Sequence, residues 1–227
     1  PIVWRVKTAF VMQQLGSPFP PKVKAVRKQI ESALAKAGFS AVDATSVTTG
    51  RDYLLKIWNL LLGCPVGGAI VHEGVTAATM ANIYYELGML QAYGRETVVV
   101  KVGSPTLPSD FARTEFVAAG RGFPSRFKPF VESLRDRNEY YLKLADTVEN
   151  NPLLAIDYLR RAALLTGDEP LRNRAGEILS AGGVGDRGVQ GHLAASVPGQ
   201  GAPQDLGDLG DGLAHRLGHG CCGVVPA

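Results

Sequence analysis

Apolar segments of strand length alternate with amphipathic segments of helix length over the first hundred residues of this chain. Strand-like runs cover Lys7–Met12, Phe39–Ala44, Gly67–Val71 and Glu96–Val102, with helix-like runs between them. The strand-like runs are nearly continuous in apolar residues, which is typical of parallel strands buried on both faces. The alternation predicts an α/β fold: an open, flavodoxin-like parallel sheet with helices on both faces.

The pattern changes at Pro124. Helical periodicity over residues 124–180 predicts a helical appendage to an α/β domain that covers residues 1–123. Residues 181–227 hold 13 of the 27 glycines and no Lys, Ile, Phe, Tyr or Trp. Such a segment buries too little apolar surface to offset the entropy of ordering, so we expect a Gly-rich, disordered tail.

Composition excludes several classes of function. The 24 Lys and Arg residues exceed the 21 Asp and Glu residues only slightly and are spread along the chain, so we expect no direct nucleic-acid partner. No apolar run approaches the roughly 20 residues of a membrane span, and the N-terminus does not resemble a signal peptide. The three cysteines indicate no disulfide framework, which favours a cytoplasmic location.

A metal site is also not expected. His215, His219, Cys221 and Cys222 lie close together near the end of the chain. Their spacing fits no standard zinc pattern, and they fall in the Gly-rich tail. We therefore predict neither a metal nor a bound cofactor.

Candidate chemistry concentrates in the segment Asn82–Gly88, which follows the third strand-like run. Open α/β sheets bind ligands just beyond the carboxyl ends of their strands. On a helical wheel, Glu86 lies at the margin of the apolar stripe, where partial desolvation raises a carboxyl pKa and suits it to nucleophilic or acid–base chemistry. A solvated glutamate on the flank of the helix is the alternative interpretation.

The start of this helix decides between the two interpretations of Glu86. If the helix began at Thr76, Glu86 would lie about 15 Å below the carboxyl edge of the sheet, too deep for a crevice there. If Thr79 or Asn82 capped it, Glu86 would reach the crevice. We expect the later start, with the helix over Asn82–Tyr93.

Other candidate binding residues stand where the predicted strands end or helices begin. Gln13, Gln14 and Gly16 follow the first strand and form either a ligand loop or an ordinary polar loop. His72 ends the third strand, as a binding residue or a structural histidine. Arg51 precedes the second helix, where a guanidinium either binds a phosphate or lies on the surface.

Four pieces of the chain carry a resemblance to known families: Gly50-Arg51-Asp52, Ala69-Ile70-Val71, Asn82-x-x-Tyr85-Glu86-Leu87-Gly88 and Leu107-Pro108-x-Asp110-Phe111-x-Arg113. In this order they resemble TIR-type domains and the related nucleoside 2-deoxyribosyltransferase-like families, over about residues 7–117. In those families a glutamate in the helix after the third strand acts at the glycosidic carbon of a nucleoside. Glu86 occupies the matching position, and the resemblance implies that Asn82 and Tyr85 lie beside the substrate.

The chain departs from both families in places. Strand three ends Val71-His72-Glu73-Gly74, without the aspartate and the Asp-Ser-Gly-Thr-like turn usual in deoxyribosyltransferases. The tryptophan typical of TIR enzymes is replaced by tyrosine, at Tyr84 or Tyr85. The first departure favours the TIR-like side of the resemblance.

The resemblance implies a hydrolase that cleaves the nicotinamide–ribose bond of NAD, with NAD as substrate and Glu86 as the essential carboxylate. It also implies self-association and a role in bacterial defence or signalling. A deoxyribosyltransferase or nucleotide N-hydrolase is one alternative. A non-enzymatic TIR-like nucleotide-binding or interaction module is the other.

Overall fold

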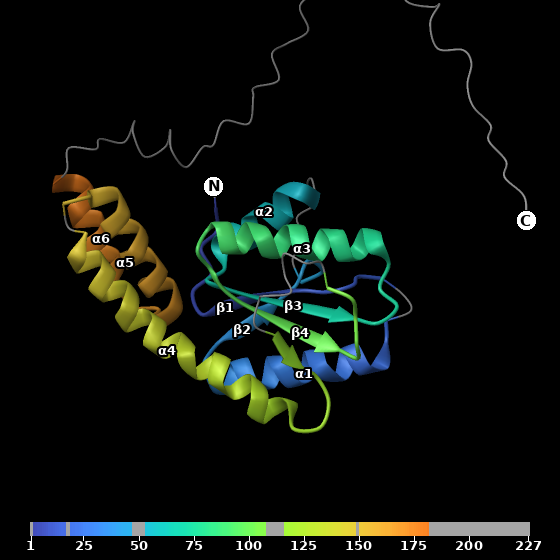
Figure 1. Ribbon diagram of the computed structural model, residues 1–227. Coiled ribbons are helices and arrows are strands. Elements are labelled where there is room, and N and C mark those ends of the chain that lie inside the picture. The colour runs from blue at the N-terminus through green and yellow to red at the C-terminus, as the bar shows by residue number, and fades with distance from the viewer. Residues whose placement is uncertain (1, 17–18, 47–52, 108–115, 149, 182–227) are drawn as a thin grey trace, which may run out of the picture. The chain divides into compact units, whose positions relative to one another are not determined.

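The computed structural model describes residues 2–16, 19–46, 53–107, 116–148 and 150–181. In this part of the chain, parallel strands form one sheet in the order β2-β1-β3-β4-β5 (Figure 1). The strands are β1 (Thr8–Met12), β2 (Ser40–Val42), β3 (Val66–His72), β4 (Glu96–Val102) and β5 (Phe116–Ala118). This is the flavodoxin-like order, so the predicted fold class is confirmed.

Helices cover both faces of the sheet. The helices of the described residues are α1 (Pro21–Lys36), α2 (Tyr53–Gly63), α3 (Ala77–Ala92), α4 (Phe123–Thr147), α5 (Pro152–Thr166) and α6 (Glu169–Ala181). The helices α1 and α4 lie on one face, and α2 and α3 lie on the other (Figure 1). Two hydrophobic layers result, one on each side of the strands.

The central strand β3 is buried along its whole length. Its Ile70 packs in the layer beneath α1 and α4, whereas Val71 packs in the layer beneath α2 and α3. Gly67 determines how closely α3 approaches, because a Cβ atom there would lie 2.3 Å from Cδ1 of Leu90. The glycine therefore lets α3 pack directly against the strand.

The C-terminal helices share the core of the sheet. Phe123 and Phe127 of α4 are fully buried in the same cluster as Val11 and Ile70, and their ring centroids are 5.3 Å apart. The described residues on both sides of residue 123, up to residue 181, belong to one compact unit. The predicted boundary at residue 123 is therefore crossed by continuous packing, and the predicted Gly-rich tail lies outside the described residues.

Local sequence signals account for both ends of α5. The side chain of Asn151 accepts a hydrogen bond from the Leu154 N–H at 3.3 Å, Pro152 opens α5, and Gly167 ends it with a φ of 75°. Asn151 is thus the N-cap of α5, Pro152 is the proline of its first turn, and Gly167 is its left-handed C′ glycine. The short strand β5 was not predicted.

The expected start of α3 was wrong. The helix begins at Ala77, and the Thr76 hydroxyl caps it by accepting a hydrogen bond from the Thr79 N–H at 3.2 Å. Gly74, with a φ of 81°, turns the chain immediately after β3 and leaves a short connection. Thr76, Thr79 and Asn82 are all good caps, so residue type alone did not distinguish them.

No helix in the described part of the chain is long and apolar enough to cross a membrane.

The position of the α3 cap can be tested by substitution. Thr76→Ala removes the capping hydroxyl and is expected to lower the free energy of unfolding by about 1 kcal/mol. Asn82→Ala, at an exposed position inside the helix, is the matched control and is expected to change it by less than about 0.5 kcal/mol. Chemical denaturation measures both, and a larger loss for Asn82→Ala would contradict the observed start.

Candidate functional site

Two of the predicted binding residues meet at the carboxyl edge of the sheet. His72 ends β3 and is 5% exposed, and its Nε2 lies 2.8 Å from Oε1 of Gln14, which follows β1. The strands β1 and β3 are neighbours on either side of the point where the strand order reverses. Ligands of open α/β sheets bind at this switch point, so the structure brings His72 and Gln14 together where a ligand is expected.

The hydrogen-bond partners of His72 restrict which of its two ring nitrogens act as donors. Its Nδ1 lies 2.6 Å from the carbonyl oxygen of Glu73, so Nδ1 carries a proton and donates it. With the Gln14 amide oxygen facing Nε2, a hydrogen bond between them requires Nε2 to be the donor. With the amide group turned, a neutral ring accepts from the Gln14 amide instead. Either arrangement ties the loop after β1 to the end of β3.

Glu73 has a structural role at the same edge. Its carboxylate accepts a hydrogen bond from the Ser104 N–H, which follows β4. A Cβ atom on Gly103 would lie 2.5 Å from the Glu73 carboxyl carbon, and the φ of 77° at this position favours glycine. Glu73 therefore joins the ends of β3 and β4.

The other predicted binding residues are dispersed. Oε1 of Gln13 is buried and has no hydrogen-bond partner among the described residues. Gly16 is exposed, with a φ of 95°, and Asn82 is exposed on α3. Arg51 and the segment around Asp110 lie outside the described residues.

Glu86 lies on α3 in a partly desolvated environment. It is half-buried, and burial raises the pKa of its carboxyl group from 4.5 to about 7. Glu86 faces the start of α2: burial raises the pKa of the Tyr53 hydroxyl there, and the charges of Glu86 and Asp43 raise it further. Glu86 is therefore not a fully solvated glutamate on the flank of α3.

Glu86 does not share the crevice occupied by His72 and Gln14. It is the tenth residue of a helix that begins at Ala77, which places it about 14 Å along the helix axis from that start. The later start that would bring Glu86 to the carboxyl edge is absent. Its surroundings are instead the face between α2 and α3, where Tyr85 is 54% exposed and Tyr84 is buried in the core.

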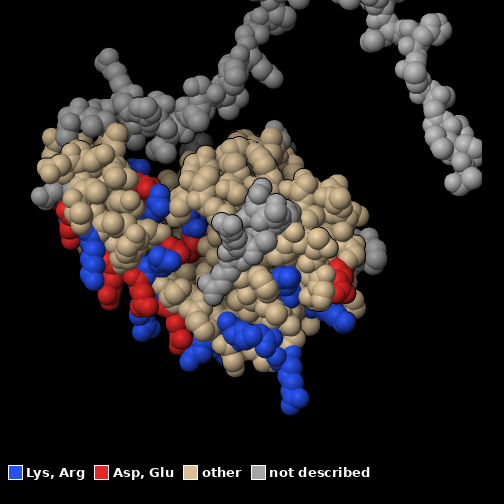
Figure 2. Space-filling model, viewed as in Figure 1, with Lys and Arg blue, Asp and Glu red and all other residues tan. Residues whose placement is uncertain are grey.

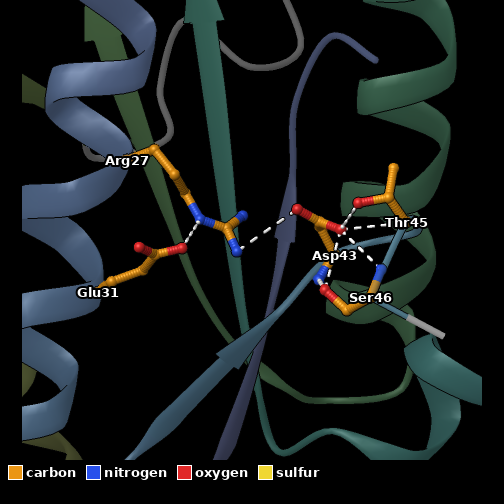
Figure 3. A network of polar contacts seen from close by, with 5 residues as sticks. All are labelled: Arg27, Glu31, Asp43, Thr45 and Ser46. Atoms are coloured by element: carbon orange, nitrogen blue, oxygen red, sulfur yellow. Dashed lines mark hydrogen bonds and ion pairs between the residues drawn. The ribbon is translucent and has the colours of Figure 1, made fainter. Parts of the chain in front are cut away.

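A polar network at the end of β2 was not predicted (Figure 3). Arg27 reaches from α1 toward Asp43: its Nε donates to Oε1 of Glu31 at 2.5 Å, and its Nη2 lies 3.6 Å from Oδ2 of Asp43. Oδ1 of Asp43 accepts from the backbone N–H groups of Thr45 and Ser46, at 2.8 and 3.0 Å. The Asp-x-Thr-Ser sequence is a signal for such a turn, but nothing local indicates the arginine.

The network keeps Asp43 ionised. Burial raises the pKa of Asp43, but hydrogen bonds from Thr45 and Ser46 and the charge of Arg27 outweigh burial, so the net shift is downward. Tyr53 thus interacts with two carboxyl groups whose pKa values move in opposite directions. Two carboxyl groups whose pKa values differ in this way can take different roles in one reaction.

Among the described residues, no group of three or more His, Cys, Asp or Glu side chains is arranged to hold a metal ion. Comparisons with protein-family models, with curated proteins and with solved structures found no match. The chemistry of the side chains is therefore the basis for the functional proposal.

The pKa of Glu86 predicts how stability depends on pH. The folded state retains the proton to about pH 7, whereas the unfolded state releases it near pH 4.5, so the residue costs stability progressively between these values. Glu86→Gln, which mimics the neutral form, should leave the free energy of unfolding nearly unchanged at pH 4. At pH 8 it should raise that free energy by on the order of 2 kcal/mol.

Denaturation of both proteins across this pH range provides the measurement. Glu139→Gln, at an exposed position on α4, is the matched control and should show no difference that grows with pH. A Glu86→Gln protein that follows the wild-type profile at every pH would contradict the desolvation of Glu86.

Proposed function

We propose that this protein hydrolyses an N-glycosidic bond in a nucleotide, specifically the nicotinamide–ribose bond of NAD, with Glu86 as the essential carboxylate. One observation carries the proposal: the residue that resembles the catalytic glutamate of TIR-type enzymes has a carboxyl pKa raised to about 7 by burial. Perturbed carboxyl groups are concentrated at functional sites.

The chemistry requires little beyond a well-placed carboxylate. Nicotinamide leaves as a neutral base, and the ribose carbon develops oxocarbenium character as the bond breaks. An ionised Glu86 either stabilises this positive charge or attacks the anomeric carbon, and water then completes the hydrolysis to ADP-ribose, nicotinamide and a proton. Both roles require the deprotonated form of Glu86.

Two tyrosines are suited to contact the nucleotide. Tyr85 adjoins Glu86 and exposes 54% of its surface, and Tyr53 exposes 53% at the start of α2. Aromatic faces of this kind pack against bases and ribose rings. Self-association, a cytoplasmic location and a role in bacterial defence or signalling stay predictions from the resemblance.

A second candidate is a nucleotide-binding module without catalysis. The separation between Glu86 and the His72–Gln14 pair favours this candidate. A nucleotide bound at the switch point of the sheet would lie beside His72 and Gln14 and away from the Glu86 carboxylate. In that case NAD or a related nucleotide binds, His72→Ala weakens binding, and no nicotinamide is released.

The enzymatic proposal is tested by incubating concentrated protein with NAD and measuring nicotinamide by chromatography. Release by the wild-type protein should rise with pH through about 7, because ionisation of Glu86 activates it. Glu86→Gln should lower the rate at least about 100-fold, whereas the exposed-site control Glu139→Gln should retain it. Activity that survives Glu86→Gln, or that falls as pH rises through 7, would contradict the mechanism.

A further inference from the structure

A groove with a volume of about 1080 Å³ lies between α1 and α4. Lys7 and Phe39, which precede β1 and β2, and Thr166 at the end of α5 line one end of it. The groove is on the face of the sheet opposite α3 (Figure 1). It is therefore separate from Glu86, and the proposed hydrolysis makes no use of it.

Positive charge dominates the lining of this α1–α4 groove. Five cationic residues line it: Lys7, Lys28, Lys36, Lys128 and Arg135. Two carboxylates, Glu132 and Asp136, line it as well, and Lys128 pairs with Glu132 at 3.2 Å. Figure 2 shows Lys and Arg side chains gathered along the side of the molecule where α1 lies.

The charges on the two walls differ. The α1 wall contributes Lys28 and Lys36 and no carboxylate, and neither lysine has an ion-pair partner among the described residues. The α4 wall alternates cations with Glu132 and Asp136. A ligand that fits this groove carries negative charge toward α1 and is neutral or mixed in charge toward α4.

The backbone at one end of the groove is strained. Among the described residues, Lys7 is the only residue other than glycine with a positive φ, which is 48°. Its N–H donates to the Leu164 carbonyl oxygen at 2.8 Å, and its carbonyl oxygen accepts from the Ser40 N–H at 2.8 Å. Strain of this kind persists only where surrounding contacts enforce it, and here it places a lysine on the lining of the groove.

We propose that the α1–α4 groove docks an acidic peptide segment of a partner protein, with its carboxylates against Lys28 and Lys36. A nucleic-acid backbone carries a charge at every phosphate, so it would also face Glu132 and Asp136. A peptide can instead direct acidic side chains to α1 and uncharged ones to α4. Gln29, Ser32 and Ser125 along the lining provide hydrogen-bonding groups for its backbone.

The experiment measures binding of a short fluorescein-labelled Glu-Ala-Ser peptide by fluorescence anisotropy at low salt. The protein should bind it, and added salt should weaken binding because the attraction is between charges. The double variant Lys28→Glu/Lys36→Glu should weaken it at least about tenfold. Lys22→Glu/Lys24→Glu makes the same change in net charge on exposed α1 positions outside the groove and should weaken it clearly less.

Carbodiimide coupling then locates the bound peptide, because it joins peptide carboxylates to nearby lysine amines. Adducts at Lys28 and Lys36 are expected by mass spectrometry. The proposal would be overturned by absence of peptide binding at low salt, by equal loss in the two double variants, or by adducts confined to lysines outside the groove. Tighter binding of a single-stranded oligonucleotide with the same dependence on Lys28 and Lys36 would also overturn it.

Discussion

The direct packing of α3 against β3 is the contact on which the rest of this structure depends. Gly67 leaves room for Leu90, and the helix lies against a strand that is buried on both faces. This contact fixes the height and rotation of α3. It also determines which α3 side chains enter the core, which of them face α2, and which remain in solvent.

Glu86 occupies the boundary between these environments. Leu87 is fully buried, Tyr85 is exposed, and Glu86 between them is half-buried opposite α2. The raised pKa therefore follows from the rotation of a well-packed helix and requires no neighbouring negative charge as its main cause. A carboxyl group that titrates near neutrality can be charged for catalysis at little cost, while retaining the low-dielectric surroundings that strengthen its interaction with a cation.

Much of the fold could be predicted because its signals are local. Nearly continuous apolar strands indicated a parallel sheet, and Asn151, Pro152 and Gly167 marked both ends of α5. The start of α3 was missed because Thr76, Thr79 and Asn82 are all good caps, so residue type did not identify the one that is used. The Arg27–Asp43 contact connects α1 with the end of β2, and the positively charged groove is formed by residues of α1 and α4. Each feature depends on residues that are distant in sequence, so no local pattern in the sequence indicated either.

The central claim is that the packing of α3 holds Glu86 partly out of water. Side-chain NMR titration of the Glu86 carboxyl carbon, assigned by comparison with Glu86→Gln, measures this most directly. The structure predicts a midpoint near pH 7 in the folded protein. A midpoint near 4.5, the value of a solvated glutamate, would contradict both the desolvation and the catalytic role that rests on it.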